Sequence, residues 1–313
     1  MSDAERPLIG WLAAFSVVVL WSGWVVISRL GVLQTLTIYD MVALRFFVAS
    51  IAVTPFVWRH WPRQLSWWKV TLFSFGQGAP YLMLAFSGLQ FAPASHAGII
   101  MNGTLPVLTA LLAWLWLKEI PSGWRVTGMG VVLIGCSLIG WDRQSVGAGP
   151  DAWVGHIMFM AAALFVAVNL IATKAWQLTA TQAMVSIPTI NLLWFGPLYI
   201  TYLPKALSDA SWAQILLQGA YQGLGPSILG VLCFTTAIRR IGTSSTAAMM
   251  ALVPGMAALL AIPVLGEWPS ALAWGGLLLA TGGILLAAGW QPRLGRGNRT
   301  TVCKTATSIE RDT

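Results

Sequence analysis

Charged side chains are scarce in this sequence. Of its 313 residues only 9% are Asp, Glu, Lys or Arg, whereas soluble domains carry about 25%. Hydrophobic residues make up 57% of the chain. This composition excludes an ordinary water-soluble globular domain and predicts a chain that resides in a lipid bilayer.

Cysteine, histidine and acidic residues are too few and too scattered for a metal centre or a catalytic group. Two of the three cysteines, Cys136 and Cys233, fall inside apolar stretches, and their spacing suits neither zinc nor a disulfide framework. The three histidines, His60, His96 and His156, form no His-x-x-x-His pair. No metal or cofactor is therefore predicted, and an enzyme, which needs converging catalytic side chains, is not expected.

Long apolar stretches fill the chain instead. A membrane-spanning helix takes about 20 residues, and ten stretches approach or exceed that length, which predicts an all-α integral membrane protein. The predicted spans cover residues 9–28, 36–58, 68–88, 93–117, 124–141, 152–173, 180–202, 213–237, 243–265 and 269–290. The polar, basic tail at 291–313 is expected to be disordered.

The basic residues give the orientation. The formal charge of +8 is concentrated in short loops and the tail, so nucleic-acid binding is not indicated. With the N-terminus in the cytoplasm, three cations face outward (Arg29, Arg143 and Lys205), one lies within a span (Arg45), and fourteen face inward. Because Lys and Arg accumulate on the cytoplasmic side, both termini are predicted there. The fourteen are Arg6, Arg59, Arg63, Lys69, Lys118, Arg125, Lys174, Arg239, Arg240, Arg293, Arg296, Arg299, Lys304 and Arg311.

The two halves of the chain, residues 8–141 and 152–290, repeat each other. Each predicted half holds five spans, and an odd number per repeat makes the second copy enter the membrane from the opposite face. The sequence therefore predicts two inverted five-helix repeats, an architecture typical of secondary transporters. At an offset of 148 residues, Pro106, Glu119, Pro121, Ser122, Gly128 and Gly135 match Pro254, Glu267, Pro269, Ser270, Gly276 and Gly283.

Several short motifs resemble those of EamA-type members of the drug/metabolite transporter superfamily. The resemblance covers residues 8–290 and implies a ten-helix carrier of the inner membrane that commonly exports amino acids or similar metabolites. The many tryptophans are similar to those of aromatic amino acid exporters in this superfamily. The motifs are Trp21-Ser22-Gly23, Arg45-Phe46, Leu105-Pro106, Leu117-Lys118-Glu119, Val253-Pro254 and Leu265-Gly266-Glu267. The sixth span departs from the pattern, because it has no counterpart of Trp21-Ser22-Gly23.

Polar and aromatic side chains inside the spans are the candidate ligands, because an unpaired polar group in lipid is costly. Gln77 and Gln222 occupy matching places near mid-membrane, where a repeat interface would hold a solute. The remaining candidates are Tyr81, Tyr221, Trp21, Trp24, His96, Asn102 and Asn169. The alternative is structural: the amides hydrogen-bond between helices and the tryptophans pack against them.

Four prolines interrupt matching spans. Pro80 and Pro226 lie beside the two glutamines, and Pro106 and Pro254 lie within a few residues of mid-membrane. Each removes a backbone hydrogen bond and bends its helix. They are predicted hinges for alternating access, with static kinks as the alternative.

Arg45 is the only permanent charge well inside a span. In hydrocarbon it needs a partner or water; Asp40 is one candidate partner and the carboxylate of a solute is another. Glu119 and Glu267 end their spans and are followed by Pro and Ser, which predicts that they cap the next helices.

No Asp or Glu falls at mid-membrane, and among intramembrane groups His96 is taken as the one titratable near neutrality. Transport is therefore predicted to be facilitated rather than tightly proton-coupled. The predicted function is export of aromatic or other neutral amino acids, or similar metabolites, by alternating access. A broad-specificity drug or metabolite carrier remains open, and a channel or membrane scaffold is less favoured. The expected partners are a small solute and the bilayer, with the protein a monomer or weak homodimer.

Overall fold

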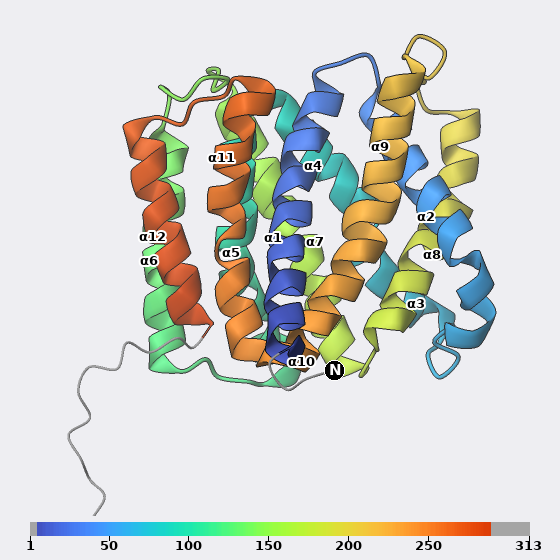
Figure 1. The fold of residues 1–313 in the computed structure, drawn as a ribbon, viewed down its shortest axis with the longest axis horizontal. Coiled ribbons are helices and arrows are strands. Elements are labelled where there is room, and N and C mark those ends of the chain that lie inside the picture. Colours follow the sequence, from blue (N-terminus) through green and yellow to red (C-terminus); the bar gives the residue numbers. More distant parts are fainter. Residues whose placement is uncertain (1–4, 289–313) are drawn as a thin grey trace, which may run out of the picture.

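Residues 5–288 are described by a computed structural model, and within that range every regular element is a helix. The helices stand side by side with their axes roughly parallel (Figure 1). Seven of them are long and apolar enough to cross a membrane. The prediction of an all-α membrane protein is therefore confirmed for this part of the chain, while the predicted disordered tail lies outside the described residues.

Six of the first seven predicted spans are single helices or nearly so. They remain helical because a span in lipid must satisfy its backbone hydrogen bonds internally, even where α2 and α8 contain prolines. These are α1 (Glu5–Val32), α2 (Ile38–His60), α5 (Ala94–Leu112) with a short π-helical turn η1 (Ala113–Leu117), α6 (Gly123–Trp141), α7 (Ala152–Ala175) and α8 (Ala180–Thr201).

The third predicted span is broken in two. Helix α3 (Trp67–Gly76) ends at Gln77, and α4 (Ala79–Phe91) starts after Gly78. Pro80 occupies the first turn of α4, where the missing N–H is no loss. Pro80 therefore begins a new helix rather than bending a continuous one.

The eighth predicted span and the beginning of the ninth form one helical run that is kinked at Gly242. It runs through α9 (Trp212–Leu224), the π-helical turn η2 (Gly225–Leu229) and α10 (Gly230–Met250), and it is followed by α11 (Val253–Leu265) and α12 (Ala271–Ala287). Gly242, with φ of 82°, turns the chain inside α10; this left-handed conformation favours glycine. The predicted boundary between spans eight and nine falls at this turn.

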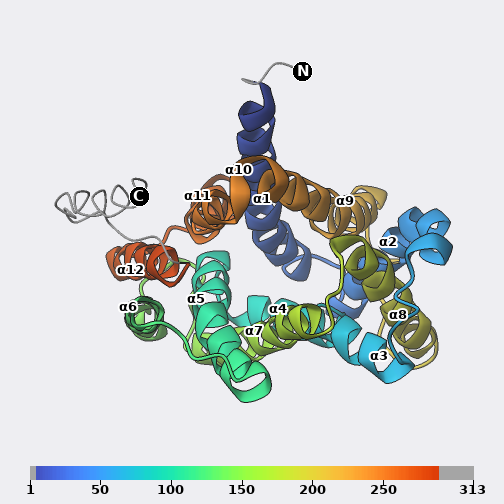
Figure 2. The same cartoon turned by 90° about the horizontal axis from the view of Figure 1, so that it is seen from below.

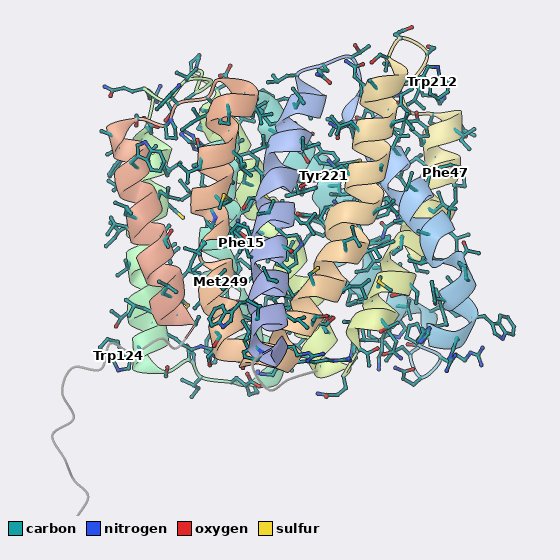
Figure 3. All side chains as sticks on the ribbon, viewed as in Figure 1. Phe15, Phe47, Trp124, Trp212, Tyr221 and Met249 are labelled. Carbon is teal, nitrogen blue, oxygen red and sulfur yellow. The ribbon has the colours of Figure 1, made fainter. Side chains whose placement is uncertain are left out.

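The helix ends define two faces of the bundle. We call the end where α1 begins the N-terminal face and the end where α1 finishes the distal face; α1 begins at the bottom of Figure 1. Figure 3 shows Trp124 near the N-terminal face and Trp212 near the distal face. Both are exposed, as are Phe15 and Phe47 between them. Apolar side chains all round the outside suit a lipid environment, with tryptophans at both interfaces.

Glycines bring α6 and α12 into backbone contact at one edge of the bundle (Figure 2). A Cβ on Gly135 would lie 2.7 Å from the carbonyl oxygen of Gly276, and one on Gly128 would lie 2.7 Å from that of Gly283. Small residues at such contacts let membrane helices approach closely. Four of the repeated glycines therefore serve packing between the two halves of the chain.

The α6–α12 contact yields a stability prediction. Gly135→Leu should destabilise the bundle by about 1–3 kcal/mol, because the added side chain forces the two backbones apart. Gly130→Leu is the matched control on the same helix, since a Cβ there meets nothing within 4 Å. The thermal unfolding midpoint in detergent should fall for the first variant only. Equal midpoints for the two variants would contradict the close contact.

Candidate functional site

A cavity of about 460 Å³ lies inside the bundle. Residues of α1, α2, α4, α5, α7, α8, η2 and α10 contribute to its wall, and most of them are apolar. The cavity reaches the N-terminal face around Thr173 and Ala180, on either side of the turn between α7 and α8. Toward the distal face it ends about one helical turn below the start of α5, at Ala97.

Six of the nine predicted ligands line this cavity: Trp21, Trp24, Gln77, Tyr81, Asn102 and Asn169. The rings of Trp24 and Tyr81 stack with centroids 5.9 Å apart. The indole N–H of Trp24 is buried and has no hydrogen-bond partner among the described residues. The aromatic wall is thus formed by α1 and α4, which are neighbours in the bundle.

The break in the third span places amide side chains at the cavity. Gln77 donates to Asn169 Oδ1 at 2.9 Å, and Asn169 donates to the Phe73 carbonyl at 2.9 Å. Asn191 of α8 accepts from the Ala79 N–H and donates to the Ser74 carbonyl. It thereby satisfies backbone groups that the break leaves free. The sequence analysis did not single out Asn191, although an asparagine within an apolar span is itself a signal.

Arg45 lines the same cavity without a carboxylate partner among the described residues. Its Nη1 donates to Gln222 Oε1 at 3.3 Å, and its guanidinium lies 5.9 Å from the Trp24 ring centroid. Asp40 is engaged elsewhere, with Tyr199 Oη and the Ala206 N–H. The suggestion that Asp40 neutralises Arg45 is therefore wrong: Asp40 caps the start of α2 and faces the loop after α8.

Gln222 and Tyr221 lie behind the cavity wall rather than in it. Gln222 is fully buried and donates to Ser28 Oγ at 2.9 Å, and Tyr221 donates to the Leu20 carbonyl at 3.0 Å. Figure 3 shows Tyr221 on α9 at mid-height of the bundle. Both side chains join α9 to α1, because the polar face of α9 turns toward that helix. This arrangement matches the structural alternative considered for the glutamines.

An ion pair closes the bundle near the distal face. Arg29 Nε donates to Glu267 Oε1 at 2.8 Å, and the same arginine donates to the Leu89 carbonyl. Glu267 also accepts from the Ala94 N–H at 2.8 Å. Each of the two charged side chains is only 6% exposed. Glu267 was predicted to cap the helix after it, and this is wrong: it caps α5, because the bundle brings the start of α5 next to the end of α11.

A second ion pair lies at the N-terminal face. Lys174 Nζ is 2.6 Å from Glu119 Oε1, and both side chains are about half exposed. Glu119 pairs with the end of α7 and makes no hydrogen bond to the start of α6. This pair joins elements at the mouth of the cavity.

His96 does not line the cavity but belongs to a buried cluster near the distal face. Its Nδ1 lies 3.0 Å from His156 Nε2 and its Nε2 lies 3.1 Å from Asp142 Oδ2. Asp142 also accepts from Ser145, Ser270 and the Gln144 N–H. Burial raises the pKa of the Asp142 carboxyl, but these hydrogen bonds outweigh it and hold that pKa well below its usual range. His156 was overlooked because nothing in the sequence places it beside His96.

The predicted hinge prolines occupy different settings. Pro226 is in η2 and lines the cavity, and Pro254 is in the first turn of α11. Pro106 alone lies inside a helix, in the middle of α5. Pro80, Pro226 and Pro254 thus stand at a helix start or a π-helical turn, whereas Pro106 stands within a regular helix, and the hinge role of all four stays a prediction.

Comparisons with known proteins identify the family. The model of the EamA-like transporter family matches residues 8–141 and again 153–289. A probable terminal-alkyne amino-acid exporter of Streptantibioticus cattleyicolor is 28% identical over 196 residues, which cover 62% of this chain and 63% of that protein, or less than two thirds of the relative's length. A solved crystal structure of an undescribed protein aligns with a TM-score of 0.58 at 21% identity, covering 91% of this chain and 97% of the other.

The two family matches together span nearly all the described helices, and the similar crystal structure supports the same fold. The resemblance noted from the motifs is confirmed: this chain belongs to the EamA-like transporter family.

Proposed function

We propose that this protein exports amino acids with apolar or aromatic side chains across the inner membrane. Both termini face the cytoplasm in this proposal, so the cavity receives the solute at the N-terminal face and releases it at the distal face. The family supports transport of a small solute, and the relative's name supports amino acids.

The observation that carries the proposal is the unpaired charge of Arg45 in an otherwise apolar cavity. A buried cation without an anion is strongly unfavourable, and a guanidinium binds a carboxylate through two parallel hydrogen bonds. Gln222 takes one N–H of Arg45 and holds the side chain in place. The carboxylate of an amino acid would supply the missing negative charge.

The rest of the cavity fits the other parts of such a solute. Amide oxygens of Asn102 and Asn169 can accept hydrogen bonds from an amino group, while Trp21 and Phe46 offer apolar surface to its side chain. The volume of about 460 Å³ is within the range of small-molecule sites, about 300–1,000 Å³.

Alternating access is supported by the two ion pairs. Arg29 and Glu267 close the distal face while Lys174 and Glu119 stand at the open N-terminal face. Arg29 corresponds to Lys174 at an offset of 145 residues, and Glu119 corresponds to Glu267 at 148, so corresponding residues form a pair at each end. In two inverted repeats, the opposite state would bury the second pair and expose the first.

Counterflow in proteoliposomes tests this function. Vesicles preloaded with unlabelled phenylalanine should take up labelled phenylalanine faster than empty vesicles, and leucine should compete. Phenethylamine, which lacks the carboxylate, should compete at least about 100-fold less well, as expected for loss of a charge-assisted pair. Exchange of a lipophilic cation with no competition by amino acids would instead establish a drug carrier.

A further inference from the structure

The buried cluster of His96, His156 and Asp142 is not part of the cavity and is not used by the transport scheme above. His96 and Asp142 are 0% and 2% exposed, and His156 is 7% exposed. The three side chains come from α5, the start of the loop after α6, and α7. Among the described residues no such group has the arrangement of a metal site.

The donors and acceptors of the two rings limit how many protons this cluster can hold. With both rings neutral, His96 Nε2–H donates to Asp142, and His156 Nε2–H donates to His96 Nδ1; we assign these tautomers from the contacts. One added proton fits on His156 Nδ1, because both hydrogen bonds survive. A second proton would sit on His96 Nδ1 and point at the N–H of His156 across 3.0 Å. The hydrogen bond that joins His96 of α5 to His156 of α7 would then be lost.

This hydrogen bond is part of the distal closure, by which we mean the helix ends that separate the cavity from the distal face. Ala97 forms the upper wall of the cavity, and its neighbour His96 belongs to the cluster. Asp142 accepts from Ser270 Oγ at 2.8 Å, which ties the loop after α6 to the start of α12. Three residues before Ser270, Glu267 binds Arg29 and the start of α5. The cluster and the ion pair thus hold together the same helix ends between the cavity and the distal face.

Other charged groups near the cluster do not supply an extra proton acceptor. Arg29 of α1 and Glu267 pair with each other. Arg143 and Asp151 of the loop after α6 are exposed to solvent. The elements α4, α11 and α12 carry no Asp, Glu, Lys, Arg or His. The two imidazoles are therefore the groups here whose ring nitrogens can take up an added proton.

We propose that His96, His156 and Asp142 form a proton-binding site, and that protons from the distal compartment open the distal closure by separating His96 from His156. Export then accelerates when the distal compartment is acidic. The expectation of facilitated rather than tightly proton-coupled transport rested on the lack of Asp or Glu at mid-membrane and on His96 as the one titratable intramembrane group, and the structure gives His96 two partners. The effect on export rests on the proposed function, whereas the opening itself does not.

Cysteine labelling tests the opening without any solute. The experiment uses Met101→Cys, in the cavity wall, in a chain from which Cys136, Cys233 and Cys303 have been removed. A maleimide that cannot cross the membrane is added on the distal side. In an acidic distal buffer, labelling should exceed that of the same chain carrying His156→Gln by about tenfold. At about pH 7.5 the two chains should label alike. Glutamine keeps a donor for His96 but takes up no proton.

His60→Gln is the matched control, because His60 lies at the end of α2 on the N-terminal face. It should label like the parent chain at both pH values. Comparing variants at one pH removes the intrinsic pH dependence of the thiol reaction. Equal labelling of the parent and His156→Gln chains in acid would overturn the proton site.

Counterflow separates this inference from the proposed function. If acidification of the distal side accelerates phenylalanine exchange in the parent and not in His156→Gln, both proposals are supported. Exchange that is rapid but indifferent to pH, with equal labelling, overturns the proton site and leaves amino acid export intact. If no exchange is seen but labelling increases in acid, the proton site is supported and the proposal of amino acid export is overturned.

Discussion

Replacing Arg45 with glutamine should reduce phenylalanine exchange by about 100-fold. A hydrogen-bonded pair that involves a charge contributes up to about 3 kcal/mol, which corresponds to roughly two powers of ten in affinity. Glutamine retains a polar, hydrogen-bonding side chain but cannot neutralise a carboxylate. The loss should appear as weaker binding of the solute, measured as a higher half-saturation concentration in counterflow.

Selectivity distinguishes a ligand role from a structural one. Arg45→Gln should abolish the preference for phenylalanine over phenethylamine, because both then lack a charged partner. Arg59→Gln, at the exposed end of the same helix α2, should behave like the parent. If Arg45→Gln lost activity and also unfolded in detergent, Arg45→Lys would decide: it keeps the charge but lacks the paired donors, so it should retain partial preference. Unchanged preference in a folded Arg45→Gln protein would disprove the carboxylate site.

Replacing Glu267 with glutamine should destabilise the protein much more than the equivalent change at Glu119. Loss of Glu267 leaves Arg29 buried without an anion, and removing one partner of a buried pair costs about 3–5 kcal/mol. The α5 cap at Ala94 is weakened at the same time. Glu119→Gln removes an exposed pair, which contributes at most about 1 kcal/mol. The repeat thus provides its own matched control.

Thermal unfolding in detergent measures both variants, and the midpoint should fall clearly only for Glu267→Gln. The double variant Arg29→Gln with Glu267→Gln should recover part of the loss, because no uncompensated charge remains. Met101→Cys labelling from the distal side should also increase in Glu267→Gln. Equal shifts of the midpoint for the two glutamate variants, or no recovery in the double variant, would contradict a stabilising buried ion pair between Arg29 and Glu267.

Much of the fold follows from local patterns in the chain. Apolar stretches such as 9–28 and 152–173 lie within α1 and α7, because a run of that length must satisfy its backbone hydrogen bonds internally in lipid. Interruptions were harder to locate. Gly78 and Pro80 marked the third span as irregular, but a complete break at Gln77 depends on Asn191 of another helix, which binds the freed backbone groups.

The site was predicted less completely, and the errors share one cause. Gln77 and Gln222 look equivalent in the sequence, yet one lines the cavity and the other joins α9 to α1. The direction in which a helix presents a polar residue depends on its neighbours in space. Asp40 and Arg45 are near in sequence but bind different partners for the same reason.

The sequence by itself determined a helical membrane protein with a duplicated pattern and an EamA-like family resemblance, because hydrophobicity, helix length and repeated motifs are local properties of the chain. Only the tertiary structure decided that Arg45 faces the cavity unpaired, that Arg29 meets Glu267, and that His96 meets His156. These partners are separated by 60 or more residues, or lie across a cavity. Their meeting depends on how helices pack around one another, which no single stretch of sequence encodes.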